Sequence, residues 1–259
     1  MERISAPSVV KFGFGAFCGC KLLKKVKLSP ALPVIADHLF FGCENLKHIN
    51  LPPFCTSIGF NSFFRSFNHC ESIKKMAILA SVTSLDESVF SYCKSLEHIE
   101  IHVELNVINS FMFEACESLK EIIIPPSVTS IRIKSFCHCH ALTQITIPPL
   151  VKTIGDFSFQ DCSSLVKIEL PSSLEIIKKN AFWGCRALRE ILIPSSVFVI
   201  EESAFDSCSS LPNITIPSSV KSIGIDVFKD CNSLTQISIP ASINPENLGL
   251  SKNTKVIIT

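Results

Sequence analysis

Hydrophobic positions along this chain recur with a spacing that fits neither one helix nor one long strand. Between Ile177 and Val199 the recurring apolar positions are Ile177, Phe182, Cys185, Leu188, Ile191, Ile193 and Val197. This spacing predicts a coil of chain that turns several corners and directs one side chain inward at each corner. Other segments repeat the same pattern, so the whole chain is interpreted as a series of structural repeats.

The pattern occurs ten times, in steps of 23 residues apart from one step of 27. A phenylalanine follows each repeat start by five residues without exception, and a cysteine follows nine of the ten starts by eight residues, while Cys70 follows Ile58 by twelve. One such unit cannot bury its apolar side alone, so we expect the units to stack against one another. The repeats start at Phe12, Ile35, Ile58, Leu85, Ile108, Ile131, Ile154, Ile177, Ile200 and Ile223.

Each repeat contains two short extended pieces. Isoleucines such as Ile122 and Ile124 alternate with period two, which indicates a strand. Seven of the ten such runs end in proline, which has no N–H to donate to a ladder and therefore ends the strand. A shorter extended piece follows, as at 196–200, and the Ala-Phe-x-x-Cys segment then forms a turn or a short helical corner. The expected fold class is an α/β-type repeat solenoid, mostly β, with a right-handed coil of about ten 23-residue repeats and parallel sheets.

Continuous repetition predicts one elongated domain over residues 1–259. Repetition decays after Pro245, so residues 246–259 are expected to close the C-terminal end, with a last strand at 255–258. No capping segment precedes the first repeat, and we expect an open solenoid end to expose core residues and a strand edge there.

The segment that begins at Leu165, LVKIELPSSLEIIKKNAFWGCRA, resembles a known repeat signature. This signature, LxxIxIPxSVxxIGxxAFxxCxS, belongs to the BspA-like (Treponema pallidum type) leucine-rich repeats. The resemblance extends over nearly all of residues 4–245, although Met76 and His102 mark two repeats that lack the usual proline. It implies a leucine-rich-repeat coil, and it implies surface-associated adhesion or host contact as a function.

The chain has thirteen cysteines, and ten of them are simply one column of the repeat. Since free cysteine packs as a small hydrophobe, we expect a buried ladder of thiols in place of disulfides. The densest sets of possible metal ligands are Cys137-His138-Cys139-His140 and Cys18-Gly19-Cys20. Zinc needs four converging ligands, and Cys139 belongs to the core column. No metal or cofactor is therefore expected, and no set of convergent, non-equivalent groups points to catalysis.

Charge is segregated along the chain although the formal net charge is only +1. Residues 1–82 carry a net charge of +6, and residues 83–130 carry −6. Stacking aligns the outward positions of successive repeats, so like charges about 5 Å apart repel each other. An anionic partner would relieve that repulsion, whereas the alternative is a solvated lysine edge that discourages aggregation. The candidate binding surface is Lys24, Lys25, Lys27, Lys47, His48, Lys74, Lys75 and His98.

These features predict a non-enzymatic module that binds protein or another macromolecule, with an acidic partner as one candidate. The small net charge argues against a nucleic-acid partner. An intracellular structural or scaffolding protein with the same fold is the alternative. The first residues do not resemble a secretory leader, and no apolar run approaches the roughly 18–20 residues of a membrane span. The compartment is left open, with the cell surface implied only by the family resemblance.

Overall fold

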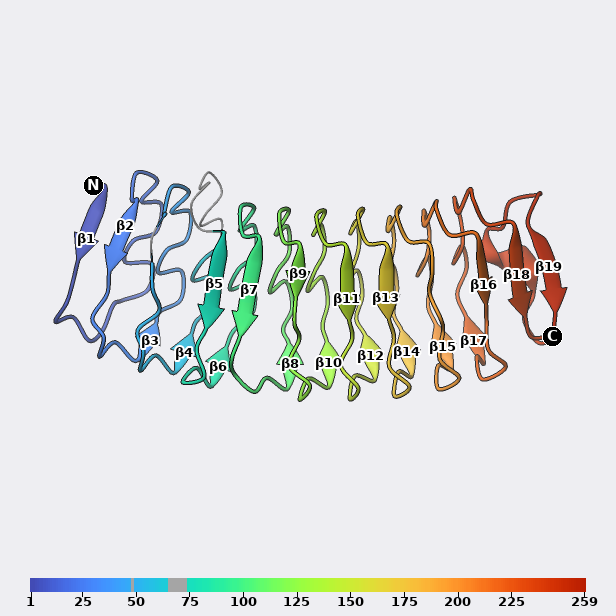
Figure 1. Ribbon diagram of the computed structural model, residues 1–259, viewed down its shortest axis with the longest axis horizontal. Coiled ribbons are helices and arrows are strands. Elements are labelled where there is room, and N and C mark those ends of the chain that lie inside the picture. The colour runs from blue at the N-terminus through green and yellow to red at the C-terminus, as the bar shows by residue number, and fades with distance from the viewer. Residues whose placement is uncertain (48, 65–73) are drawn as a thin grey trace.

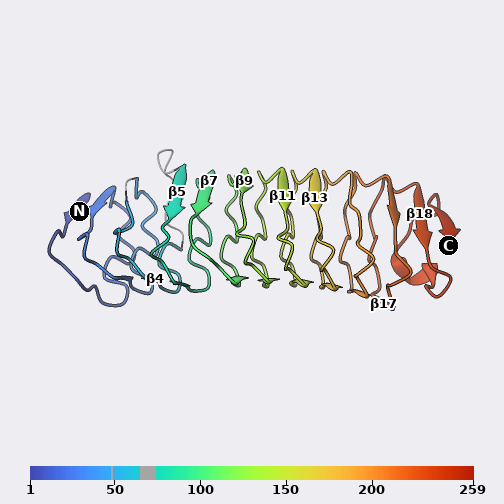
Figure 2. The same ribbon diagram turned by 60° about the horizontal axis from the view of Figure 1, so that its bottom comes forward.

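The computed structural model describes residues 1–47, 49–64 and 74–259, which form a rod of stacked coils (Figure 1). The two termini lie at opposite ends of the rod. Figure 2 shows the same order of coils after a 60° turn, so successive repeats lie side by side along the rod. All strand pairs are parallel, for example between Met76 and Ile99 and between Ile237 and Val256. The expected solenoid of stacked repeats with parallel sheets is confirmed.

One side of the rod, here termed the long-strand face, carries most of the longer strands. It is not a single sheet, because it divides between β2 and β5, between β9 and β11, and between β13 and β16. Residues 49–51, which occupy the place between β2 and β5, are not in a strand. The strands of this face are β1 (Arg3–Ser5), β2 (Lys25–Lys27), β5 (Lys75–Ile78), β7 (His98–Ile101), β9 (Glu121–Ile122), β11 (Gln144–Thr146), β13 (Lys167–Glu169), β16 (Asn213–Thr215), β18 (Gln236–Ile239) and β19 (Lys255–Ile258).

A second side carries two-residue strands that end at the isoleucine or leucine of each repeat start. That residue is directed inward, and it is fully buried in most coils, as at Ile154 and Ile177. Six of these strands form one continuous sheet in the order β17-β15-β14-β12-β10-β8. The strands are β3 (Val34–Ile35), β4 (Ser57–Ile58), β6 (Ser84–Leu85), β8 (Val107–Ile108), β10 (Ser130–Ile131), β12 (Thr153–Ile154), β14 (Ile176–Ile177), β15 (Val199–Ile200) and β17 (Ser222–Ile223).

The Ala-Phe-x-x-Cys corner is a chain of turns and not a helix in the described repeats. Its N–H groups alternate between two uses. Phe159 N donates to the Ala181 carbonyl of the next coil at 2.8 Å, whereas Gln160 N donates back to the Phe157 carbonyl at 3.1 Å. This alternation of hydrogen-bond partners requires the left-handed backbone conformation at two positions of the corner, such as Phe157 (φ 55°) and Asp161 (φ 53°). Most of these positions are not glycine, so the stacked coil holds a backbone conformation that L-residues ordinarily avoid.

The phenylalanine column forms a continuous stack through the core. Neighbouring rings from Phe17 to Phe228 lie 5.2–5.7 Å apart and within 24° of parallel. From Phe40 to Phe228 each ring is at most 1% exposed. The predicted buried phenylalanine column is therefore confirmed, with Phe17 at the first repeat only partly buried.

The cysteine column has a polar role as well as a packing role. The Cys185 thiol donates a hydrogen bond to the Phe159 carbonyl of the preceding coil at 3.2 Å, and seven other described cysteines of this column donate equivalent bonds. A buried carbonyl can accept two bonds, and the thiol is small enough to reach it. Burial raises the pKa of these thiols, to about 12 at Cys43 and Cys231.

We expect native thiols to react with an alkylating reagent in two groups at pH 8. Cys18 is exposed and Cys20 is only partly buried, so both should label rapidly. Buried thiols such as Cys162 have raised pKa values and little thiolate at this pH, so they should label at least about 100-fold more slowly. Peptide mass spectrometry of timed samples measures each site. Rapid labelling of Cys162 or Cys185 in the native protein would contradict the buried ladder, and unfolding without reductant should expose every thiol.

The hydrophobic core is covered at the C-terminal end of the rod and partly exposed at the N-terminal end. At the C-terminal end, the 3₁₀ helix η1 (Pro245–Leu248) lies against the last phenylalanine, and the Leu248 carbonyl accepts a hydrogen bond from Phe228 N at 2.9 Å. Leu248 itself is fully buried, and β19 extends the sheet beyond β18. At the N-terminal end, Phe14 is 74% exposed and Phe12 and Phe17 are only partly buried.

Candidate functional site

Lysine and glutamate side chains one repeat apart pair across neighbouring coils. Lys94 lies 2.7 Å from Glu117, and Lys178 lies 2.8 Å from Glu201. Each pair joins residues that are 23 positions apart in sequence. Stacking places such residues side by side at about one strand spacing, so the repeat period itself determines which charges meet.

Three residues of the predicted basic surface take part in such pairs. Lys24 Nζ lies 2.8 Å from Glu2 Oε1, and His98 Nδ1 lies 3.1 Å from Glu121 Oε1. Lys74 Nζ lies 2.8 Å from Glu97 Oε1. The Glu97 carboxylate also accepts a bond from Lys120, and the hydrogen bonds of Lys120 and then Lys74 lower the pKa of Glu97 to about 2. Lys24 and Lys74 thus already have anionic neighbours.

Four other lysines of that surface form no ion pair with a carboxylate of the described residues. None of the ion pairs within residues 1–47, 49–64 and 74–259 includes Lys25, Lys27, Lys47 or Lys75. Their neighbours in register are cationic or neutral: Lys25 pairs with Arg3, and Lys75 pairs with His98. Lys47 is partly buried and the other three are exposed. His48, the remaining residue of the predicted surface, lies outside the described residues.

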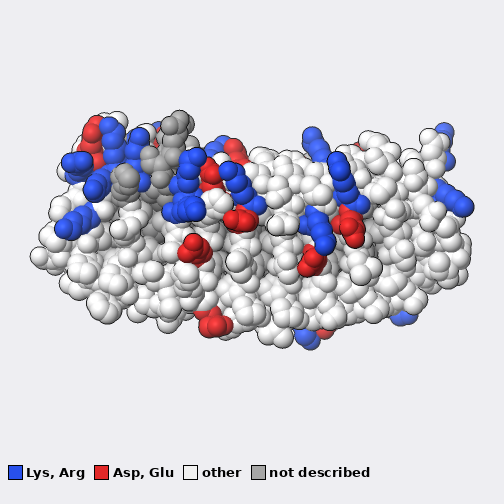
Figure 3. Space-filling model, viewed as in Figure 1, with Lys and Arg blue, Asp and Glu red and all other residues white. Residues whose placement is uncertain are grey.

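These four lysines line one groove of about 800 Å³ on the long-strand face, here termed the N-terminal groove. It lies over residues 49–51, where the face is interrupted between β2 and β5. Figure 3 shows Lys and Arg side chains gathered over the first coils, whereas much of the rest of this view carries few charged groups. Apart from the lysines, the residues that line the N-terminal groove are largely apolar and include Ile49, Pro30 and Pro53. The groove therefore combines concentrated positive charge with an apolar floor.

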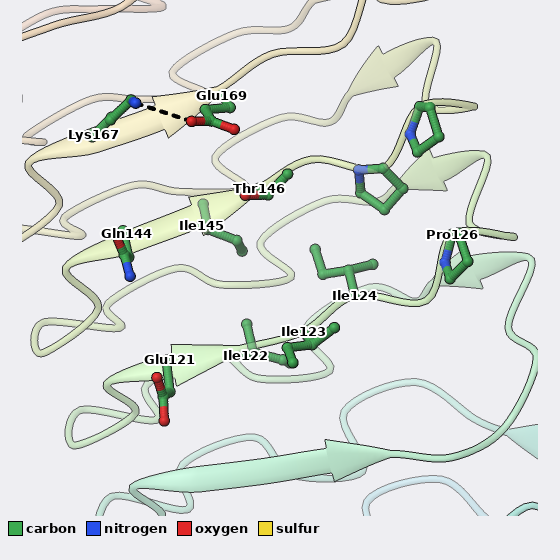
Figure 4. Close-up of a pocket in the computed structure, with 12 residues that line it drawn as sticks. Glu121, Ile122, Ile123, Ile124, Pro126, Gln144, Ile145, Thr146, Lys167 and Glu169 are labelled. Carbon is green, nitrogen blue, oxygen red and sulfur yellow. Dashed lines mark ion pairs between the residues drawn. The ribbon is translucent and has the colours of Figure 1, made fainter.

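A second groove, here termed the central groove, occupies about 430 Å³ at the interruption between β9 and β11. In Figure 4, Glu121 and Gln144 lie toward one end, and Ile124 and Pro126 lie toward the other. Lys167 pairs with Glu169 at 2.9 Å along its side. Positive charge here is neutralised, so the two grooves differ in their electrostatics as well as in their volume.

The sequence Cys137-His138-Cys139-His140 does not converge on a single point. Cys139 donates its thiol bond into the core, while His138 Nδ1 lies 3.5 Å from Asp161 Oδ2. His140 Nδ1 instead lies 2.9 Å from the Asp161 carbonyl. Within the described ranges, no group of three or more potential metal ligands is assembled. Cys18 and Cys20 lie at the exposed end of the first repeat.

Sequence reasoning grouped the basic residues along the chain but did not identify which of them are paired. The signal was present, since Glu97 follows Lys74 by one repeat period and Glu121 follows His98 by one period. No carboxylate stands at that offset beside Lys47 or Lys75. Comparing charges one period apart would have separated the paired Lys74 and His98 from Lys47 and Lys75.

Comparisons with known proteins bear first on the fold. The chain is similar to the crystal structure of a leucine rich cell surface protein from Faecalibacterium prausnitzii, with 25% identity and a TM-score of 0.59 over 100% of this chain and 88% of that one. It is similar to the T. pallidum leucine rich repeat protein, with 28% identity and a TM-score of 0.58 over 62% of this chain and 78% of that one. A leucine-rich repeat protein from Bacteroides ovatus matches with 24% identity and a TM-score of 0.57 over 100% of this chain and 84% of that one.

The family of the chain follows from its sequence match to a repeat family. No curated protein sequence matches the chain significantly. Among the residues that the structure describes, none forms a helix that is long and apolar enough to cross a membrane. Residues 1–66 and 129–249 match the family described as BspA type leucine rich repeat region, with six copies of the repeat. Together with the stacked phenylalanine and cysteine columns, this match shows that the chain belongs to the BspA-type leucine-rich repeat family.

Proposed function

We propose that this protein is a non-enzymatic, surface-displayed interaction module of the adhesin or surface-antigen type. Membership in the BspA-type family supports a protein-interaction repeat module as the general class. One observation carries the proposal. Inward positions stay the same from coil to coil, whereas outward positions on the long-strand face change, from Lys27 through Ile123 to Thr215. A fixed core with a variable outer surface suits recognition of a macromolecule and not turnover of a small substrate.

The proposal treats residues 1–259 as one binding domain with the partner on the long-strand face. Both described grooves on strands β2 to β13 open on this face. The short-strand sheet is more uniform, because hydroxyl or β-branched residues such as Ser130, Thr153 and Val199 occupy its outward column. The name of the F. prausnitzii neighbour, a cell surface protein, supports display at a surface.

An intracellular scaffold with the same fold is the second candidate. It is favoured by the thiols, because all twelve cysteines in the part of the chain that the structure describes are free. Free thiols are typical of reducing compartments, whereas exported proteins more often contain disulfides. The two candidates share the binding face and differ in location.

Antibody labelling of intact and permeabilised cells of the source organism separates the two candidates. We expect intact cells to label, and brief protease treatment of intact cells should remove the signal. An antibody to an unrelated cytosolic protein should label only permeabilised cells and serves as the control. Labelling that appears only after permeabilisation would reject surface display and leave the scaffold.

A further inference from the structure

We propose that the N-terminal groove binds an extended acidic polypeptide segment that carries an apolar side chain among its carboxylates. The inference rests on the proposed function, since it names the partner chemistry of the same interaction module. It concerns Lys25, Lys27, Lys47 and Lys75 together with the apolar floor between them.

The charge of the groove favours an anionic occupant. Lys24 and Lys74 flank the groove but are paired with Glu2 and Glu97 at 2.8 Å. The four groove lysines have no such partner within residues 1–47, 49–64 and 74–259, and Lys25 stands in register with Arg3. Concentrated like charge raises the free energy of the unbound protein, and carboxylates from a partner would lower it.

The floor of the groove favours a polypeptide over a sulfated polysaccharide. Ile49 is partly buried, and Pro30 and Pro53 are exposed along the same groove. A polysaccharide could satisfy the lysines but would leave these apolar surfaces in contact with water. An aliphatic or aromatic side chain would cover them and gain the free energy of apolar burial. The exposed Asn50 side chain offers both a donor and an acceptor for a peptide backbone.

The spacing of the lysines suits an extended chain that runs along the rod. Lys25 and Lys75 lie on β2 and β5, which are two coils apart, or about 10 Å at the usual strand spacing. An extended peptide in the polyproline II conformation advances about 3.1 Å per residue and has three residues per turn, so carboxylates three residues apart lie on one side and can reach both lysines. The central groove would repel the same peptide, because Glu121 and Glu169 line it and Lys167 is already paired.

Fluorescence anisotropy with three labelled probes tests the assignment. The first probe is the peptide Glu-Leu-Gly-Glu-Leu-Gly-Glu, the second has serine in place of both leucines, and the third is a sulfated polysaccharide. The groove variant carries K25S, K27S, K47S and K75S. The matched control carries K221S, K229S, K252S and K255S, four exposed lysines of the last coils, and therefore has the same net charge.

We expect the groove variant to bind the leucine peptide at least tenfold more weakly than wild type at 50 mM salt. The control variant should bind it like wild type, and raising salt to 300 mM should weaken wild-type binding through screening. The leucine peptide should also bind more tightly than the serine peptide. Equal loss in the two variants, equal affinity for the two peptides, or lysine-dependent binding of the polysaccharide alone would overturn the proposal. Surface labelling is independent of these results, so either proposal can fail while the other stands.

Discussion

Replacing Phe159 by alanine should lower the free energy of unfolding by about 3–5 kcal/mol. Phe159 is fully buried, and its ring lies 5.3 Å from the Phe136 ring and 5.5 Å from the Phe182 ring. Alanine would open a cavity at the centre of the ring stack and remove two aromatic contacts, each worth about 0.5–1.5 kcal/mol. The Phe159 carbonyl would still accept the Cys185 thiol bond, so the loss measures packing. Urea unfolding followed by far-UV circular dichroism gives the midpoint and slope.

Phe157→Ala is the matched control for this experiment. Phe157 lies in the same turn but is only partly buried, and its ring faces Lys134 Nζ at 5.8 Å. The same chemical change should therefore cost well under half as much, since little cavity forms. Equal midpoints for Phe159→Ala and wild type would contradict the ring stack as a source of stability. Because each coil contacts only its neighbours, a central defect weakens two interfaces at once.

The inward columns made the fold predictable from the sequence. Phe136, Leu142, Ile145 and Ile154 recur at fixed offsets, and only a stacked coil buries all of them together. The corner was left open between a turn and a short helix. Residues such as Phe157 and Asn180 adopt positive φ angles because of hydrogen bonds to the next coil, a cause that local propensity does not contain.

The thiol bonds could not be inferred from residue type. A cysteine column predicts small apolar packing, and the carbonyl that Cys162 meets belongs to Phe136 of the preceding coil. The distance between these atoms depends on the exact stagger of two coils, which the repeat period does not specify. Ser173 and Ser196 likewise donate hydroxyl bonds to carbonyls of the preceding coil, at 2.8 Å and 2.6 Å.

The candidate site was predictable as a charged region but not as a groove. Lys25, Lys47 and Lys75 could be grouped from their places in the repeat, whereas the interruption of the sheet at residues 49–51 could not. Whether a strand forms there depends on the backbone hydrogen bonds between that coil and the two adjacent coils. Ile49 and Pro53 lie beside the lysines at this interruption and add an apolar requirement to an electrostatic one.

Replacing Leu248 by aspartate should destabilise the C-terminal end by more than about 4 kcal/mol. Leu248 is the last residue of η1 and is fully buried, and its carbonyl accepts a hydrogen bond from Phe228 N. The substitution removes an apolar side chain from the end of the ring stack and puts a carboxylate in its place. Burial would raise the pKa of that carboxyl in the folded state, so the folded protein binds the extra proton more tightly than the unfolded chain does. Stability should therefore recover in part as the pH falls below the folded-state pKa and be lost as the pH rises through it.

Amide hydrogen exchange locates the damage from Leu248→Asp. Beyond β18 lie only η1 and β19, so exchange should accelerate at Ile237 and Ile239 of β18 while Ile145 and Ile168 in the central strands stay protected. Leu248→Met is the matched control, because a volume-conserving apolar change should cost less than about 1.5 kcal/mol. Unchanged exchange at β18 in the aspartate variant would mean that η1 does not cover the end of the core. Acceleration that reached the central strands equally would instead mean that the rod unfolds as one cooperative unit, and that the closing segment stabilises every coil and not only the last.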